Sequence, residues 1–280
     1  MLSDKELDDL SKKTIDDFGV QWSVYTENRG YYASTDHFED IFSPLIDIKK
    51  IKGARVGDIG SGTGRVVAML AHLGASEILA LEPSQGYETL LKNTERFGSI
   101  VKPMRASGEK LPPGSDLDFV FSIGVIHHIP DPDPIIKAMY DGLRPGGTAA
   151  VWLYGKEGNE LYLSLALPFR AISHILPHSI LAGLCWALWF PLLAYIKLCK
   201  VLAFLPMSGY FVNVVDKCDS GVQRLIIYDQ LNPAYAKYYT QDEAEQLLAK
   251  AGFINVRLFH RHGYSWSVAG DKPDTPQSQS

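Results

Sequence analysis

Residues 57–64 read GDIGSGTG, and this stretch decides the fold. A strand-like run, residues 54–59 (ARVGDI), leads into it, and residues 64–73 (GRVVAMLAHL) follow with the apolar spacing of a helix. Glycine lacks a Cβ atom and a helix N-terminus offers free N–H groups, so a glycine-rich turn here favours a polar or anionic ligand. The alternative is a tight strand–helix turn that binds nothing.

The spacing of the glycines narrows the choice of ligand. They lie at positions 60, 62 and 64, whereas the dinucleotide fingerprint is G-x-G-x-x-G, and no Gly-Lys-Ser/Thr follows to make a P-loop. Glu82 follows the apolar run ILAL, 22 residues after Gly60, where a carboxylate can accept two hydrogen bonds from a ribose diol. Loop and carboxylate together predict a site for the nucleoside part of a cofactor. Both NAD and S-adenosylmethionine contain such a part.

Strands and helices alternate after the loop. The expected strands are residues 77–81, 99–104, 117–123 and 148–154, and the expected helices are 84–97 and 132–143, with a turn at RPGG, 144–147. Several of these strands are apolar almost throughout. That pattern is typical of a parallel sheet covered by helices on both faces.

The α/β pattern returns near the end of the chain. Thr240-x-x-Glu243 is a capping box for a helix over 241–250. Residues 253–259 and 264–269 read as two strands joined by the short loop His260–Gly263. This antiparallel hairpin predicts a Rossmann-like, mostly parallel, seven-stranded mixed sheet with helices on both faces.

The expected organisation has five segments, with an apolar helical insert between the fifth and sixth strands. They are an N-terminal helical lid (1–50), a cofactor-binding Rossmann-like half (51–155), the apolar insert or substrate cap (156–232), a C-terminal helix and hairpin (233–270) and a tail (271–280). The tail reads DKPDTPQSQS, and this polar, proline-containing composition predicts disorder.

Composition sets limits on partners and location. The net charge is −5 and no long basic run occurs, which argues against nucleic acid as the main partner. The first residues, MLSDKELDDLSKK, lack an apolar signal-peptide stretch, and the three cysteines show no CxxC spacing. We therefore expect a cytoplasmic protein with reduced thiols and no metal site.

The insert contains an unusual acid-free stretch. Residues 161–215 hold no Asp or Glu, and 179–196 (SILAGLCWALWFPLLAYI) are apolar nearly all round but interrupted by Pro191. A single membrane span would separate the last strands from their sheet. Two interpretations stay open: a helical lid over the substrate pocket, or a hairpin over 161–206 that also makes peripheral contact with a membrane. The basic side chains that could meet lipid headgroups, or form a solvated rim, are Arg170, His174, His178, Lys197 and Lys200.

Four motifs in order and spacing identify a family resemblance. RVGDIGSGTGRVV (55–67), LALEPS (79–84), ASGEKLP (106–112) and DFVFSIGVIHHIPDP (118–132) resemble the class I S-adenosylmethionine-dependent methyltransferases, in particular the ubiquinone/menaquinone-biosynthesis branch. The resemblance covers roughly residues 50–155, with a weaker continuation over 240–270. It is specific for fold and cofactor and says little about the methyl acceptor.

The resemblance implies a role for each matching residue. Asp58 would lie near the ammonium group of the cofactor, and Glu82 would hold the ribose hydroxyls. Ser107 stands where the family usually has Asp, and a hydroxyl accepts a hydrogen bond from the adenine amino group more weakly than a carboxylate. The other residues implied in cofactor binding are Gly60, Ser61, Gly62, Gly64, Pro83, Gly108 and Glu109.

Two aromatic residues near the N-terminus are further candidates for the cofactor site. Trp22 and Tyr25 would close over the cofactor as part of the N-terminal lid, where an aromatic face stabilises a sulfonium cation. Ordinary core packing is the alternative for both.

His127 and His128 follow the fourth strand, at the carboxyl edge where open α/β sheets bind ligands. Histidine can act as a base near neutral pH, so this pair is the candidate catalytic group. The alternative is a structural corner over the cofactor. Metal binding is not expected, because adjacent side chains diverge and no third ligand is evident.

The sequence thus predicts S-adenosylmethionine-dependent methyl transfer to a small, hydrophobic or lipid-like acceptor such as a quinone or isoprenoid. A nicotinamide-dependent oxidoreductase is a rival with a similar fold. A non-catalytic cofactor-binding or membrane-associated scaffold is a rival from another class.

Overall fold

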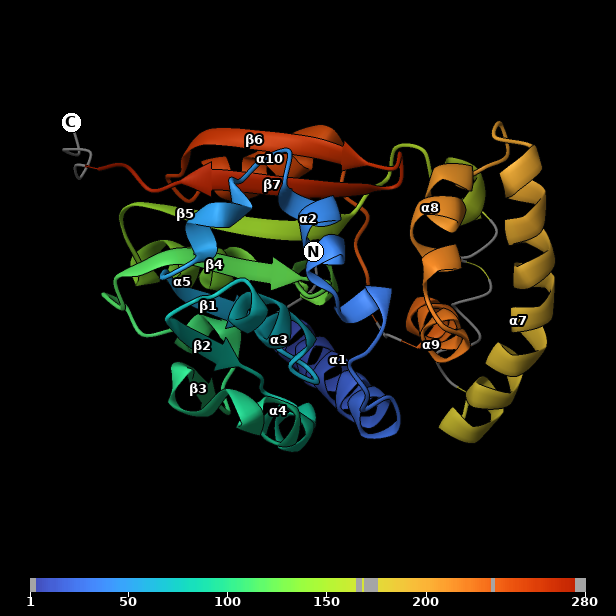
Figure 1. The fold of residues 1–280 in the computed structure, drawn as a ribbon, viewed down its shortest axis with the longest axis horizontal. Coiled ribbons are helices and arrows are strands. Elements are labelled where there is room, and N and C mark those ends of the chain that lie inside the picture. Colours follow the sequence, from blue (N-terminus) through green and yellow to red (C-terminus); the bar gives the residue numbers. More distant parts are fainter. Residues whose placement is uncertain (1–3, 165–167, 169–175, 233–234, 275–280) are drawn as a thin grey trace.

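A seven-stranded sheet forms the centre of the computed structural model, which describes residues 4–164, 168, 176–232 and 235–274 (Figure 1). The strand order is β3-β2-β1-β4-β5-β7-β6. Neighbours among the first five strands are parallel, and β7 is antiparallel to both β5 and β6. The strands are β1 (Arg55–Ile59), β2 (Glu77–Leu81), β3 (Val101–Met104), β4 (Leu117–Ile123), β5 (Leu143–Tyr154), β6 (Ile254–Arg261) and β7 (Ser265–Asp271). The expected mixed sheet is confirmed.

Helices bury both faces of this sheet. One face packs against α2 (Thr35–Phe42), α3 (Arg65–His72) and α4 (Gly86–Thr94), and the other against α5 (Asp133–Gly142) and α10 (Gln241–Ala249). On the first face the rings of Phe38 and Phe42 lie 5.1 and 5.5 Å from that of Phe121 in β4. Because strands buried on both sides must be apolar, the continuous apolar runs of the sequence follow from this layering.

Short 3-10 turns connect the longer elements. They are η1 (Tyr31–Ala33), η2 (Ile48–Ile51), η3 (Glu95–Ile100), η4 (Gly108–Lys110), η5 (Ile126–His128) and η6 (Val215–Lys217). The helix expected over 84–97 is α4 followed by η3 in the structure. Within η3, Gly98 has a φ of 60° and interrupts the helical path.

The RPGG turn is part of β5 in the structure. Leu117 pairs with Leu143 and Phe119 with Thr148, so residues 144–147 bulge out of an otherwise continuous ladder. The hairpin turn also falls later than expected, since β6 continues to Arg261 and β7 begins at Ser265. The capping box is confirmed: the Thr240 hydroxyl accepts from the Glu243 N–H, and the Glu243 carboxylate accepts from the Thr240 N–H at 3.0 Å.

The insert between β5 and β6 is helical, as expected. Its described helices are α7 (His178–Val201), α8 (Ser208–Asn213) and α9 (Ser220–Leu231). Figure 1 shows the parallel strands pointing toward this insert, with α7 at the outer edge of the molecule and α8 and α9 between it and the sheet. Arg170, His174 and the side chain of His178 lie outside the described residues.

The N-terminal helix α1 (Asp4–Val24) packs beside α4 near the same end of the sheet. The glycine loop, the N-terminal helix and the insert therefore meet at the carboxyl edge of the parallel strands (Figure 1).

Candidate functional site

The site begins where the strand order reverses. From β1 the chain proceeds to β2 and β3 on one side, whereas β4 and β5 lie on the other, so the carboxyl ends of β1 and β4 form a topological switch point. The loops after these two strands touch, because a Cβ atom built on Gly60 would overlap the side chain of Val125. Gly60 is thus required by the close approach of the two loops that frame the site.

The glycine loop is fixed by hydrogen bonds to the end of β2. Gly60, Gly62 and Gly64 have φ values of 72°, 52° and 82°, a left-handed conformation that glycine adopts without steric cost. The N–H groups of Gly60 and Ser61 donate to the Leu81 carbonyl at 2.8 and 2.9 Å. These bonds hold the loop open beside the residue that follows, Glu82.

Glu82 joins the loop to the cavity. Its carboxylate accepts from the Gly62 N–H at 2.7 Å and from the Ser84 N–H at 2.9 Å, and the side chain is buried. A carboxylate has about four lone-pair positions, so each oxygen keeps the capacity to accept from a ligand. Glu82 lies in the cavity wall, where the resemblance expects the ribose hydroxyls.

Two glycines of the loop have different surroundings. A Cβ atom on Gly62 would lie 3.2 Å from the indole ring of Trp22, which covers the loop from α1. A Cβ atom on Gly64 would lie 2.8 Å from the Thr94 side chain, and Gly64 caps α3 outside the cavity wall. Gly64 thus serves the packing of α3 on α4, which the sequence pattern does not distinguish from ligand contact.

Asp58 lies in β1, buried beside the cavity but outside its wall. Burial raises the pKa of this carboxyl to about 7, and nearby Glu82 acts in the same direction, while Arg65 opposes the shift. Its Oδ2 atom has no hydrogen-bond partner among the described residues. A buried carboxyl with an unsatisfied oxygen at this position suits a cationic group brought by a ligand.

The expected adenine end also forms part of the wall. Pro83, Ser107, Gly108 and Glu109 all line the cavity. A Cβ atom on Gly108 would overlap the side chain of Ile59, so glycine allows this loop to lie against β1. Ser107, which the resemblance places where the family usually has Asp, is thus part of this wall.

The N-terminal segment is tied to the glycine loop. Asn28 donates to the Thr63 carbonyl at 2.8 Å and accepts from the Thr63 hydroxyl at 2.7 Å. The Arg65 guanidinium lies 4.0 Å from the centre of the Tyr32 ring. Trp22 and Tyr25 both line the cavity, but the Tyr25 ring packs against Tyr228 of α9, at 5.6 Å, on the side of the insert.

The two candidate histidines occupy different environments. His128 lines the cavity, and its Nδ1 lies 2.8 Å from the Tyr235 carbonyl, which can only accept. Nδ1 therefore carries a proton, and Nε2 is the acceptor nitrogen of the neutral ring. His127 is fully buried, stacks on Tyr154 at 3.8 Å and is absent from the cavity wall. The geometry thus does not bring His127 to the site as a base.

One cavity of about 830 Å³ extends from the glycine loop to the insert. Its insert end is lined by apolar side chains from α7, α8, α9 and the residue that follows α8, among them Leu188, Leu192, Phe211, Val214 and Ile227. A polar cluster interrupts this surface. The Tyr154 hydroxyl donates to the Asp229 carboxylate at 2.7 Å and accepts from the Gln230 amide at 2.8 Å, and Gln21 donates to the other Asp229 oxygen at 3.1 Å.

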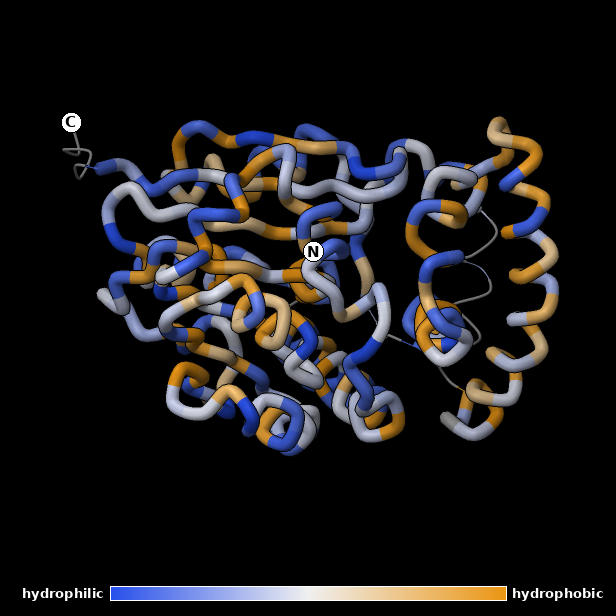
Figure 2. Tube along the Cα trace, in the orientation of Figure 1, coloured by the Kyte–Doolittle hydropathy of each residue, from blue (hydrophilic) through white to orange (hydrophobic). Residues whose placement is uncertain are grey.

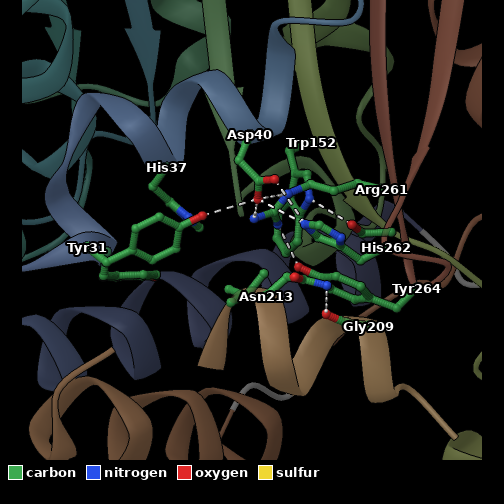
Figure 3. A network of polar contacts seen from close by, with 12 residues as sticks. Tyr31, His37, Asp40, Trp152, Gly209, Asn213, Arg261, His262 and Tyr264 are labelled. Carbon is green, nitrogen blue, oxygen red and sulfur yellow. Dashed lines mark hydrogen bonds and ion pairs between the residues drawn. The ribbon is translucent and has the colours of Figure 1, made fainter. Parts of the chain in front are cut away.

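A second polar network contributes Arg261 and Tyr264 to the wall of the cavity (Figure 3). Asp40 of α2 accepts from the buried Arg261 of β6 and lies 2.9 Å from His262 Nε2, and Tyr31 donates to it at 3.3 Å. Arg261 also donates to the Tyr264 hydroxyl at 2.6 Å. These ion pairs and hydrogen bonds hold the pKa of Asp40 below its usual range despite burial. The network fixes α2 on the terminal hairpin, and the separation of 221 residues between Asp40 and Arg261 hides it from sequence patterns.

The described residues show no grouping of three His, Cys, Asp or Glu side chains that could hold a metal ion. The glycine loop, by contrast, fits a nucleoside cofactor. Its Gly62 backbone carries no Cβ, Glu82 faces the cavity, and Asp58 retains an unsatisfied oxygen beside it.

Comparison with known proteins agrees with this geometry. Residues 57–151 match the family model of the methyltransferase domain. Curated relatives include the tRNA U34 carboxymethyltransferases of Alteromonas mediterranea and Desulfotalea psychrophila, which are 25% and 30% identical over 126 and 115 residues. These matches cover 42% and 40% of this chain but 38% and 36% of those proteins, so the chain spans well under half of their length.

A solved structure matches almost the whole chain. The 1,6-didemethyltoxoflavin-N1-methyltransferase of Burkholderia thailandensis, with bound S-adenosylhomocysteine, has a TM-score of 0.56 and 12% sequence identity. The match covers 98% of this chain and 92% of that one, and at this identity it shows the fold.

Residues 57–151 thus belong to a methyltransferase domain, built on the Rossmann-like fold that the strand order shows. Its cofactor is S-adenosylmethionine. Neither the family model nor the fold specifies the acceptor.

Proposed function

We propose that this protein transfers the methyl group of S-adenosylmethionine to a small apolar acceptor, such as a quinone or isoprenoid. The observation that carries the proposal is the single cavity of about 830 Å³ shared by the glycine loop and the insert. This volume lies near the upper end of the range for small-molecule sites, roughly 300–1,000 Å³, so it offers room for a cofactor and a second molecule. The apolar side chains of α7–α9 favour an acceptor with an apolar body.

When bound, S-adenosylmethionine supplies a methyl group already activated by its positive sulfur. The protein's task is then to position the acceptor and exclude water. Tyr154 and Asp229 offer a hydroxyl and a carboxylate in the acceptor half of the cavity, where they would orient a polar group of the acceptor. His128 offers Nε2 as the acceptor nitrogen of its neutral ring and is the better placed of the two histidines to take a proton.

A tRNA acceptor is the second candidate, because several curated relatives are named tRNA U34 carboxymethyltransferases. Two features of this chain favour the small molecule. Its net charge is −5, which repels a phosphate backbone, and the insert helices stand over the cavity end that an acceptor would occupy.

The three cysteines are buried and free, which supports a cytoplasmic location.

Release of S-adenosylhomocysteine tests this function. The purified protein is incubated with S-adenosylmethionine and either an organic-solvent extract of cells or purified tRNA. We expect the extract to stimulate release several-fold over the background without acceptor, and tRNA to leave it unchanged. Stimulation by tRNA alone would overturn the small-molecule proposal and favour the second candidate.

A further inference from the structure

The long helix of the insert has two apolar faces, of which the protein uses one. Residues at spacings of three and four face inward: Leu181, Cys185, Ile196 and Cys199 are buried, and Leu188 and Leu192 between them line the cavity. This stripe packs α7 against α9, where Leu181 and Cys185 meet Tyr228 and Leu231. The inner face alone accounts for the position of α7 in the fold.

The outer face of α7 remains exposed although it is apolar. Ile180, Trp186, Phe190, Leu198 and Val201 are 46–80% exposed, and Phe204, just beyond the helix, is 81% exposed. Figure 2 shows hydrophobic residues repeated along the whole length of this helix at the edge of the molecule. An exposed apolar patch of this kind marks a surface that contacts a membrane or another protein.

The charged side chains of α7 itself have one sign. Residues 161–215 contain no Asp or Glu, and Lys197 and Lys200 lie exposed near the C-terminal end of α7. Lys200 pairs with Asp216 at 2.7 Å, whereas Lys197 makes no ion pair within the described part of the chain. Arg224 of α9 lies 4.0 Å from the centre of the Trp186 ring. Exposed Trp and Phe side chains with basic neighbours complement the anionic surface of a bilayer.

We infer that the outer face of α7, together with Phe204, docks on the surface of an anionic lipid bilayer, with the helix lying along the interface. By length and composition α7 could cross a membrane, but its inner face is buried on α9 and lines the cavity. Only the outer face is thus open to lipid. This geometry fits an interfacial helix and not a span.

Docking would give a lipid-like acceptor a short route to the site. Leu188 and Leu192 line the cavity on one side of α7, while Trp186 and Phe190 lie exposed on the other. A single helix thus separates the proposed bilayer surface from the acceptor half of the cavity. This part of the inference rests on the proposed function, whereas docking itself does not.

Vesicle flotation tests the docking surface. Phosphatidylcholine vesicles with and without phosphatidylglycerol are mixed with the protein and floated on a density gradient. We expect binding to the anionic vesicles that salt weakens. The double substitution Phe190→Ser with Phe204→Ser should reduce the bound fraction at least about tenfold. Leu91→Ser with Ile254→Ser, which changes two exposed apolar residues elsewhere, is the matched control and should bind like the wild type.

Three outcomes would overturn the inference: no binding to anionic vesicles, equal binding of the Phe190/Phe204 variant, or a dimer that the same variant dissociates in analytical ultracentrifugation. Calorimetric binding of S-adenosylhomocysteine by each variant checks that the fold is kept. Vesicle binding without methyl transfer would contradict the proposed function alone, and methyl transfer without vesicle binding would contradict docking alone.

Discussion

The carboxylate of Glu82 accepts a 2.7 Å hydrogen bond from the backbone N–H of Gly62. The residue expected to hold the cofactor ribose therefore also fixes the glycine loop that lies beside it. The second Glu82 oxygen is held by the Ser84 N–H, so the carboxylate has a single orientation before any ligand binds. Loop and carboxylate form one preorganised unit.

Glu82→Gln should loosen this unit. The side-chain NH2 group of glutamine would replace one carboxylate oxygen and face a backbone N–H that needs an acceptor. A buried donor left without an acceptor costs about 1–3 kcal/mol. We expect a lower thermal midpoint and an affinity for S-adenosylhomocysteine at least about tenfold weaker, equivalent to ~1.4 kcal/mol, by calorimetry. Glu88→Gln is the control, because Glu88 is exposed and pairs only with Arg105 at the surface. Unchanged affinity in Glu82→Gln would contradict the role of this carboxylate.

Gly62→Val should abolish measurable cofactor binding. Position 62 has a left-handed φ of 52°, and its Cβ atom would lie 3.2 Å from Trp22, so valine strains the backbone and displaces the indole ring. Gly114→Val imposes similar backbone strain at a φ of 69° with nothing within 4 Å of its Cβ atom. Calorimetry should show that only the control binds S-adenosylhomocysteine. A Gly62→Val protein with wild-type affinity would rule out the loop as the cofactor site.

The affinity for S-adenosylhomocysteine should rise with pH up to neutrality. Burial raises the pKa of Asp58 to about 7, so the carboxyl is protonated at lower pH in the free protein. A ligand ammonium beside it would favour the charged carboxylate, lower its pKa and release a proton on binding. Affinity then increases by at most about tenfold per pH unit below pH 7 and levels off above it.

Asp58→Asn isolates this contribution. The asparagine variant should bind S-adenosylhomocysteine with a flatter pH profile, measured by calorimetry between about pH 5.5 and about pH 7.5. Parallel profiles for wild type and variant would show that Asp58 does not meet the ammonium group.

Tyr154→Phe should impair the acceptor and spare the cofactor. The change removes a hydroxyl that donates to Asp229 at 2.7 Å and accepts from Gln230 at 2.8 Å, on the insert side of the cavity. We expect acceptor-dependent release of S-adenosylhomocysteine to fall about tenfold, with cofactor affinity changed less than about twofold. Tyr140→Phe, on α5 where the ring packs against Phe253, is the matched control. Loss of cofactor affinity in Tyr154→Phe would show that the hydroxyl serves the cofactor and not the acceptor.

The sequence was sufficient to predict the sheet because its strands are buried on both faces and must be apolar. The runs over 77–81 and 117–123 are strands with the same bounds in the structure. The RPGG segment could not be recognised as a bulge, since its place in the ladder depends on pairing with β4. The hairpin turn was misplaced because His260 and Arg261 read as loop residues but continue β6, where Arg261 is held by Asp40.

The candidate site, like the fold, could be predicted from the sequence only in part. Local motifs predicted which loops meet at the switch point, and nine of the eleven residues expected to bind the cofactor, Tyr25 included, line the cavity. The direction of each side chain could not be predicted from these motifs. His127 and His128 are neighbours in the sequence, yet only His128 lines the cavity. The pairing of Tyr154 with Asp229 depends on how the insert folds back over the sheet, and no local pattern encodes it.

The central claim is that this domain methylates an apolar small molecule. Its most direct test is mass spectrometry of a whole-cell extract, containing both lipids and tRNA, after incubation with the protein and S-adenosylmethionine that carries a deuterated methyl group. We expect the labelled methyl group on an organic-soluble metabolite, and no transfer by the Gly62→Val protein. Label found only on tRNA or protein would contradict it.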